Sequence, residues 1–398
     1  MEKVLKISFK VLCIIVLIII LAIAGLYISG NQYLIKAVRT TYLKGHTSVY
    51  IDDYPYFNNN VIRAGIPQNW ELHEKYNDIQ LNDILRKELE DFKTVGFGII
   101  KDGKLLYEEY WDNYSDESLT NSFSMAKSIT TMLLGKAIEQ GYIQSVDQLV
   151  TDFIPEFLND SLGRLATVGD LSSMRSGFDW SEEYSSPINM TTEAYFGNNI
   201  EKQMLKRSFK LRPGGHFKYS SADSQLLAIV LKRATGKGLA QYLSEEFWQP
   251  MGMEHDALWS MSGEIEKSFC CVYSNVRDFA KLGQLLLQKG NWEGKQLLDS
   301  AFVNLMTMPN SEAFDSGEPE KYGYSIWTDK EFHSPFYGML GLLGQRVIVV
   351  PDENLVIVRL GKSRDKSPSA RPLDKDIYLL VDETIKSIQS FSDASPQK

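Results

Sequence analysis

An uncharged apolar run near the N-terminus constrains the fold of this chain more than any other feature. Residues 11–29, VLCIIVLIIILAIAGLYIS, contain no charged side chain. At a rise of about 1.5 Å per residue, a helix of this length nearly matches a hydrocarbon layer about 30 Å thick. The run therefore predicts a transmembrane signal-anchor helix.

The charges that flank this run are almost balanced. Three basic residues precede it and three follow it, so only the free amino terminus favours a cytoplasmic N-terminus. We expect residues 1–10 to be a short cytoplasmic tail of a single-pass protein in a bacterial cell membrane, with the rest on the extracytoplasmic side. The alternative is a cleaved signal peptide, but the run is long for one and GLYISG is a poor cleavage site. The six basic residues are Lys3, Lys6, Lys10, Lys36, Arg39 and Lys44.

The remaining composition is that of a globular protein without an obvious metal or nucleic-acid site. Hydrophobic residues make up 43% of the 398 positions and charged residues 23%, which allows a sizeable core. The net charge of -9, without a basic stripe, argues against nucleic acid as a partner. Cys13, Cys270 and Cys271 include an adjacent pair and no CxxC, so they predict neither a disulfide framework nor a zinc site. The histidines, also without metal-binding spacing, are His46, His73, His216, His255 and His333.

Local patterns predict strands near both ends of the chain and helices between them. Residues 94–111 form two strand-like runs, and the Asp102-Gly103 pair between them predicts a tight hairpin turn. Residues 345–361 form two strands rich in Val and Ile around a Pro-Asp-Glu-Asn turn. Helices are predicted at 81–92, from Ser124 to a cap at Gly141, and at 375–389.

Strands so far apart in the sequence most simply join one antiparallel sheet. We expect an α/β fold of the α+β type: an antiparallel β-sheet flanked by helices, plus a mainly helical lobe, with the site in the cleft between them. Pocket walls are expected in loops 178–200 and 308–338. Residues 30–60 predict a stalk or arm, residues 61–390 the folded domain, and residues 391–398 a flexible tail.

The stretch NSFSMAKSIT contains a serine and a lysine that could react together. Ser124 and Lys127 are three residues apart, so they lie on one face of a helix, and their apolar neighbours would desolvate the amine and favour its use as a base. The alternative is that Ser124 caps the helix and Lys127 is solvated. The motif alone does not distinguish the catalytic interpretation from the capping one, because Ser-x-x-Lys occurs twice more in the chain where no apolar helix follows. These copies are Ser363 with Lys366 and Ser395 with Lys398.

Five stretches in a fixed order provide the context for Ser124. They are FSMAKS at 123–128, GYIQSVDQLVTDFIPEF at 141–157, DLSSMRSGFDW at 170–180, RPGGHFKYSSADSQLLAIVLKRATGKGL at 212–239, and WQPMGM at 248–253. Together they resemble the serine β-lactamase and penicillin-binding-protein superfamily. The likeness is to its class C β-lactamase-related branch of esterases, D-aminopeptidases and 6-aminohexanoate-oligomer hydrolases, and it covers about residues 60–390. It implies a β-lactamase/DD-peptidase-like fold with Ser124 as nucleophile and Lys127 as base.

The same resemblance implies a second catalytic element, Tyr-x-Asn or Tyr-x-Ser. Tyr219-Ser220-Ser221 follows RPGGHFK and precedes a helical run, as the family's motif does. Tyr219 would relay a proton between Ser124 and the leaving group, with Ser221 as a secondary candidate. The alternative is a buried tyrosine with a satisfied hydroxyl. The pattern also occurs at Tyr184-Ser185-Ser186 and Tyr273-Ser274-Asn275, where Ser274 is better explained as a helix cap.

The third family element departs from the expected pattern. Where relatives carry Lys-Thr-Gly or His-x-Gly, this chain has Met339-Leu340-Gly341, so the cationic or imidazole group is missing. Gly341 would let substrate approach the strand, and the backbone N–H of Leu342 would complete an oxyanion hole with that of Ser124. The GxxGQ form, which ends at the secondary candidate Gln345, is similar to the esterase and 6-aminohexanoate-oligomer hydrolase branch.

These features favour a membrane-anchored serine hydrolase that cleaves an ester or amide bond through an acyl-enzyme. One alternative is a penicillin-binding protein or β-lactamase that acts on D-amino-acid peptides or β-lactams. The other is a non-catalytic extracytoplasmic ligand-binding sensor with the same fold. An α/β-hydrolase is disfavoured because no GxSxG occurs. We expect no cofactor and no metal, and as partners a small ester, amide or peptide-like substrate and the membrane.

Overall fold

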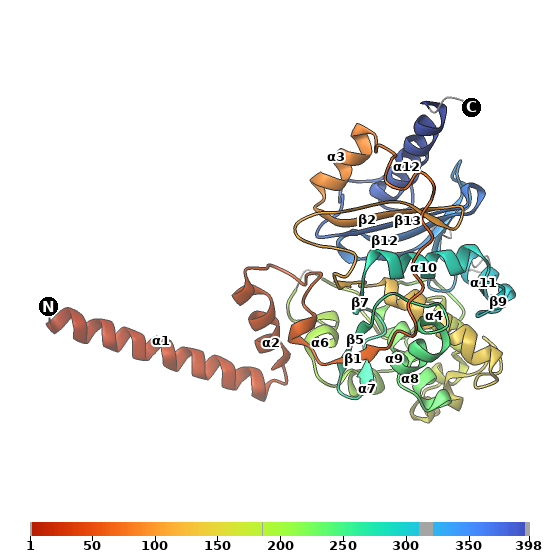
Figure 1. The fold of residues 1–398 in the computed structure, drawn as a ribbon. Helices are drawn as coiled ribbons and strands as arrows, with labels where there is room; N and C mark the ends of the chain where they lie inside the picture. The colour runs from red at the N-terminus through yellow and green to blue at the C-terminus, as the bar shows by residue number, and fades with distance from the viewer. Residues whose placement is uncertain (1, 185, 310–320, 395–398) are drawn as a thin grey trace.

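The N-terminal helix lies apart from the folded body (Figure 1). The structure is a computed structural model that describes residues 2–184, 186–309 and 321–394. Helix α1, Glu2–Ile28, begins before the uncharged run, and Lys6 and Lys10 lie within it. Its segment Val4–Ile28 has a mean hydropathy of 3.3 and none of it is buried, so its length and composition suit a membrane span. A signal sequence would pass the same test.

Residues 30–60 pack on the body instead of forming a free stalk. Helix α2, Tyr33–Thr40, buries Tyr33 and Ala37 in the main hydrophobic core, against α6. The buried Asp53 accepts hydrogen bonds from the hydroxyls of Tyr195 and Tyr273, both at 2.7 Å. Both apolar and polar side chains of this segment are therefore buried against the body.

A six-stranded antiparallel sheet joins the two ends of the chain, as the sequence predicts. Its order is β10-β11-β12-β13-β2-β3, and the pairing of β13 with β2 brings residues 355–361 beside residues 94–101. The β2–β3 turn has Asp102 and Gly103 at φ of 53° and 77°, the left-handed values that an Asp-Gly hairpin turn supplies. The strands are β2 Thr94–Lys101, β3 Lys104–Tyr110, β10 Trp327–Asp329, β11 Phe336–Gly341, β12 Gln345–Val350 and β13 Leu355–Gly361.

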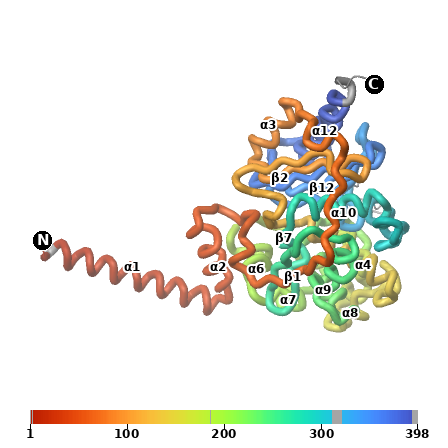
Figure 2. Tube along the Cα trace, in the orientation of Figure 1, coloured from red at the N-terminus to blue at the C-terminus, as the bar shows by residue number. Residues whose placement is uncertain are grey.

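Helices cover both faces of this sheet (Figures 1 and 2). Alternate residues of β12 and β13 enter two hydrophobic clusters, one toward α10 and one toward α12 and α3, so both strands carry apolar residues on both faces. Helix α12 continues to Ala394, past the predicted end at 389, and residues 395–398 of the predicted tail lie outside the described chain. The bounds are α3 Asp83–Asp91, α10 Val276–Leu287 and α12 Lys375–Ala394.

The middle of the chain forms a mainly helical lobe around α4, Met125–Glu139, which is buried on nearly all sides. The lobe also contains a second small sheet, of order β1-β5-β7-β4 with β6 beside β5, that the sequence pattern did not reveal because most of its strands are short. Its strands are β1 Asn59–Ile62, β4 Thr120–Asn121, β5 Ala257–Ser262, β6 Ile265–Glu266 and β7 Val272–Ser274. The other helices are α5 Val168–Ser172, α6 Met190–Phe196, α7 Ile200–Leu205, α8 Ser221–Thr235, α9 Leu239–Leu243 and α11 Ser300–Thr307.

The two adjacent cysteines are joined to each other. Cys270 and Cys271 form a disulfide, both are buried, and they lie just before β7. A bond between neighbours encloses no intervening residue and links no distant segments, so it differs from the disulfide framework that the sequence argued against.

Candidate active site

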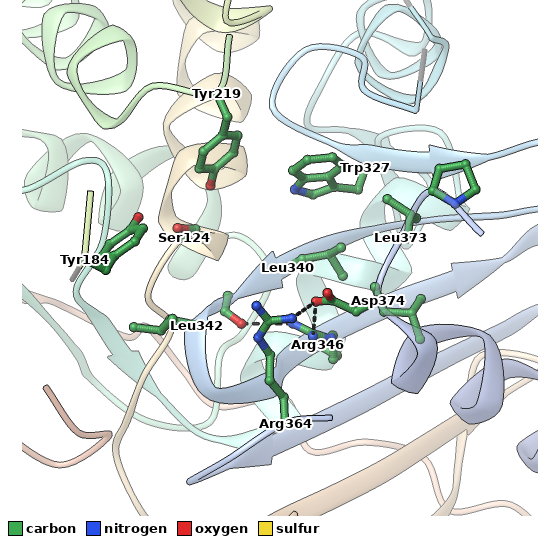
Figure 3. A pocket seen from close by; sticks show the side chains of 13 residues that line it. Ser124, Tyr184, Tyr219, Trp327, Leu340, Leu342, Arg346, Arg364, Leu373 and Asp374 are labelled. Atoms are coloured by element: carbon green, nitrogen blue, oxygen red, sulfur yellow. Dashed lines mark hydrogen bonds and ion pairs between the residues drawn. The ribbon is translucent and has the colours of Figure 1, made fainter. Parts of the chain in front are cut away.

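A cavity of about 270 Å³ lies where the helical lobe meets the edge of the six-stranded sheet (Figure 3). Its walls include Ser124, Tyr219, Gly341 and Leu342, which come from segments far apart in the sequence. The fold thus brings four of the candidate residues to one pocket between the two lobes. Lys127 lies beneath it, and the secondary candidates Ser221 and Gln345 do not line it.

Ser124 lies at the start of α4, and its hydroxyl is not bonded to the helix backbone. It occupies the N-cap position, but its side chain makes no capping hydrogen bond. The preceding residue, Phe123, has a φ of 44°, and its N–H donates to Asn121 Oδ1 at 2.9 Å. Ser122 N–H donates to Val272 O at 2.7 Å, which ties the same turn to β7. This tight turn aims the Ser124 side chain away from the helix and into the pocket.

Lys127 is held against Ser124 in the interior of the protein. Its side chain is buried, and Nζ donates to Ser124 Oγ at 3.0 Å and to Phe269 O at 2.9 Å. Within the part of the chain that the structure describes, no carboxylate pairs with this amine. The arrangement allows proton exchange between the amine and the serine hydroxyl. The hypothesis of a solvated first-turn lysine is therefore wrong.

Tyr219 covers the Ser124 and Lys127 pair from the opposite wall. Lys127 Nζ lies 5.0 Å from the centre of the Tyr219 ring, and the phenol oxygen points toward Ser124 (Figure 3). The ring packs beside Trp327 and Tyr322, with centroids 5.7 and 6.1 Å away. Packing by these rings orients the Tyr219 hydroxyl over the pocket.

A buried carboxylate supports the loop that carries Tyr219. Asp223 Oδ1 accepts from Ser220 Oγ at 2.9 Å and from Ser176 Oγ at 2.8 Å, and Asp223 N–H donates back to Ser220 Oγ at 3.2 Å. Burial raises the pKa of Asp223 from 3.8 to about 7, against the opposing effect of the hydrogen bonds from the Ser176 and Ser220 side chains.

The Asp223→Asn variant should become more stable, relative to the wild type, as pH rises. Because the pKa of Asp223 is raised in the folded state, its contribution to stability is fully present below about 4 and is lost as pH rises through about 7. We therefore expect the thermal midpoint of the wild type minus that of the variant to fall from pH 4 to pH 8. The surface variant Asp256→Asn serves as the control, and a difference that rises with pH would contradict the prediction.

Ser221 is hydrogen-bonded to a carboxylate and not to Ser124, Lys127 or Tyr219. Its Oγ and its N–H donate to Glu182 at 2.7 and 2.8 Å. The same carboxylate accepts from the hydroxyl of Tyr184, which lines the pocket, and from Trp180 Nε1 at 2.7 Å. Ser221 therefore braces the Tyr184 wall, and its hydroxyl does not face Ser124.

Gly341 is required by packing on the segment before the nucleophile. A Cβ at this position would overlap Ser122 O, so only glycine lets the end of β11 approach so closely. The sequence had suggested that this glycine admits substrate. Gln345 is fully buried, and its carboxamide donates to Leu342 O at 3.1 Å and to Gly361 O at 2.7 Å. It thereby supports the turn that carries Leu342.

Sequence patterns missed several residues of the pocket wall. Tyr184 and Trp327 lie within the two loops where walls were expected. No pattern singled out Trp327, and Tyr184 appeared only as a further copy of the Tyr-x-Ser pattern. Arg346 is a buried charge in the apolar strand β12, and Arg364 follows β13. Arg346 directly precedes the apolar run VIVV, and a charged residue inside a strand expected to be buried is the sequence signal that could have revealed it.

Both arginines at the pocket are neutralised by nearby carboxylates. Arg346 pairs with Asp376 at 3.0 Å and with Asp374 at 3.2 Å, and its Nη1 donates to Gly341 O at 2.9 Å. Arg364 forms an ion pair with Asp374 (Figure 3). The pocket therefore has cations near the third element, but they are already paired with two aspartates.

A serine hydroxyl in contact with a buried lysine amine, beneath a tyrosine and beside the edge of an antiparallel sheet, is an arrangement that can activate serine as a nucleophile. The beta-lactamase family model matches residues 81–381, and the chain belongs to this family. The enzyme is thus a serine hydrolase with a β-lactamase-like fold, as the sequence resemblance implied.

Individual relatives and structures are similar to this chain at low identity. The 6-aminohexanoate-dimer hydrolase of Paenarthrobacter ureafaciens is 24% identical over 302 residues, which cover 71% of this chain and 76% of that protein. A Bacillus anthracis structure provisionally named a 6-aminohexanoate-dimer hydrolase has a TM-score of 0.72 at 22% identity and covers 87% of this chain and 94% of that one. A family VIII carboxylesterase has a TM-score of 0.62 at 17% identity, over 82% of this chain and all of the other.

Proposed function

We propose that this enzyme hydrolyses an ester or amide bond through an acyl-enzyme on Ser124. The observation that carries the proposal is the 3.0 Å contact between Ser124 Oγ and the buried Lys127 Nζ at the base of the pocket. Lys127 accepts the hydroxyl proton while Oγ bonds to the substrate carbonyl carbon. The N–H groups of Ser124 and Leu342 stabilise the resulting oxyanion.

Tyr219 supports the departure of the leaving group and the hydrolysis of the acyl-enzyme. Its hydroxyl delivers a proton to the leaving oxygen or nitrogen and regains one from the Lys127 ammonium; the bond to the acyl group breaks, and an acyl-enzyme with neutral Lys127 and Tyr219 remains. Water then attacks the acyl carbon and gives a proton to this pair, which returns a proton to Ser124 as the bond to Ser124 Oγ breaks and the acid is released. The intact trio of Ser124, Lys127 and Tyr219 argues against a non-catalytic sensor.

The pocket chemistry favours an uncharged ester or amide over a penicillin. Leu340, Leu373 and Trp327 supply apolar walls. Among the described residues both arginines of the pocket are paired with aspartates, so neither arginine is free to bind a substrate carboxylate. The names of the carboxylesterase and the 6-aminohexanoate-dimer hydrolases among the similar proteins agree with this substrate class.

We also propose that α1 anchors the enzyme in a bacterial cell membrane with the catalytic domain on the extracytoplasmic side. The support is the exposed apolar segment Val4–Ile28, which lies outside the folded body. The protein should then stay in the membrane pellet after an alkaline carbonate wash and be degraded by protease added to intact spheroplasts. Release by the wash would contradict the anchor.

A substrate panel with the full-length chain tests the catalytic proposal. We expect turnover of short-chain p-nitrophenyl esters or anilides and weak covalent capture of a fluorescent penicillin. Strong stoichiometric capture without ester turnover would favour a penicillin-binding protein, and no turnover of any ester or amide would favour a sensor.

A further inference from the structure

A second cavity lies at the far end of α10 and shares no lining residue with the catalytic pocket. It also has a volume of about 270 Å³. Its walls come from residues 68–71, the β2–β3 turn, the C-terminal half of α10, and the hairpin of β8, Asn291–Trp292, with β9, Lys295–Gln296. Residues 68–71 belong to the segment that passes over α10 on its way to α3 and β2 (Figure 2).

Two polar groups of this cavity are buried without a hydrogen-bond partner. Gln284 is 3% exposed, and its buried Oε1 accepts no hydrogen bond from any described residue. Trp292 is 9% exposed, and its Nε1 also has no partner within the described chain. Buried polar groups in folded proteins are nearly always paired, and such an exception calls for an explanation. A bound ligand that supplies both a donor and an acceptor would explain both groups.

The aromatic walls of the cavity are rigid. The rings of Trp70 and Trp292 meet edge to face, with centroids 6.3 Å apart. Trp70 Nε1 donates to Arg277 O at 3.0 Å, which holds its ring in place. The two indoles therefore offer a fixed apolar surface beside the carboxamides of Gln284, Gln288 and Asn69.

The charges at the cavity do not suit an anion. Lys281 is buried, and its Nζ already donates to Gln68 O at 2.6 Å and to Gly252 O at 2.7 Å, with Glu254 4.0 Å away. Glu71 and Glu293 line the cavity as well, and Glu71 is paired with Lys104, so the charges around the cavity nearly balance. The ligand must therefore be neutral or nearly so.

We propose that this cavity is a non-catalytic binding site for a saccharide, of the type of an N-acetylated amino sugar. A pyranose ring has a flat C–H face that packs on an indole, while its hydroxyl and acetamido groups both donate and accept hydrogen bonds. Those are the groups that the Gln284 carboxamide and Trp292 Nε1 lack. The rim carboxylate of Glu293 accepts from a further hydroxyl. Small-molecule sites commonly combine apolar walls with a few placed polar groups in this way.

Isothermal titration of the full-length enzyme with triacetylchitotriose tests the proposal. The protein should be kept in a detergent without a sugar headgroup, because a glucoside detergent would compete. We expect saturable binding in the millimolar range or tighter. Gln284→Leu and Trp292→Phe should each weaken it about ten-fold, the usual effect of losing one buried hydrogen bond.

Matched variants separate this site from the catalytic pocket. Trp327→Phe makes the same change in the other cavity and should leave sugar binding unchanged, as should Ser124→Ala. If Gln284→Leu fails to fold, Trp292→Phe still decides the matter because it keeps most of the ring volume. The proposal is overturned by an absence of binding heat at saturating sugar, by wild-type affinity in Trp292→Phe, or by loss of binding in Trp327→Phe.

Discussion

Replacing Ser124 with alanine is expected to lower kcat/KM for a p-nitrophenyl ester by at least about 10⁴-fold. The variant lacks the oxygen that attacks the carbonyl carbon, and Lys127 then has only Phe269 O as an acceptor. Folding should be intact because Ser124 makes no capping bond with α4. The measurement is steady-state ester turnover, together with labelling by a fluorescent fluorophosphonate, which should vanish in the variant.

The second Ser-x-x-Lys copy within the described chain provides the control for this experiment. Ser363 lies in a loop after β13, and Ser363→Ala should turn over ester and label like the wild type. Equal fluorophosphonate labelling of the wild type and Ser124→Ala would remove Ser124 as the nucleophile. Loss of labelling in Ser363→Ala would point to a different serine.

Lys127→Met is expected to lower kcat by about 10³-fold or more, with little change in KM, because the amine acts on protons in the reaction and not in substrate binding. The methionine side chain fills the buried space but leaves Phe269 O without a donor. This unpaired carbonyl should lower the free energy of unfolding by about 1–3 kcal/mol. The measurements are ester kinetics, the rate of fluorophosphonate labelling and the thermal midpoint.

Lys136 is a matched control on the same helix. Its side chain is buried, and its Nζ donates to Leu297 O at 3.1 Å, much as Lys127 donates to Phe269 O. Lys136→Met should therefore destabilise the protein to a similar degree and still hydrolyse ester. Equal losses of kcat in the two variants would show that Lys127 has only a structural role.

Sequence patterns were most informative where the physical cause is local. The hairpin at Asp102-Gly103 follows from the backbone angles those two residues favour, and the pairing of Ser124 with Lys127 follows from helical spacing. Sequence patterns were least informative where the position of a residue depends on packing against segments far away in the sequence. The sequence did not show that the predicted stalk or arm packs on the body, because Tyr33 and Asp53 are buried by side chains far away in the sequence, from the helical lobe and β7. The small sheet of the lobe was not predicted because strands of two or three residues, such as β4, β6 and β7, are too short to show an alternation of apolar and polar residues.

The sequence by itself determined the apolar N-terminal helix, the strands at the two ends of the chain and a serine one helical turn from its lysine, because each depends on neighbours within a few residues. Tertiary structure alone decided how Tyr219 lies over Lys127, why Gly341 must lack a side chain, and which aspartates neutralise Arg346. It also decided that Gln284 and Trp292 share a second cavity. These features depend on contacts between segments far apart in the chain, where position is set by packing of the whole core and not by local conformational preference.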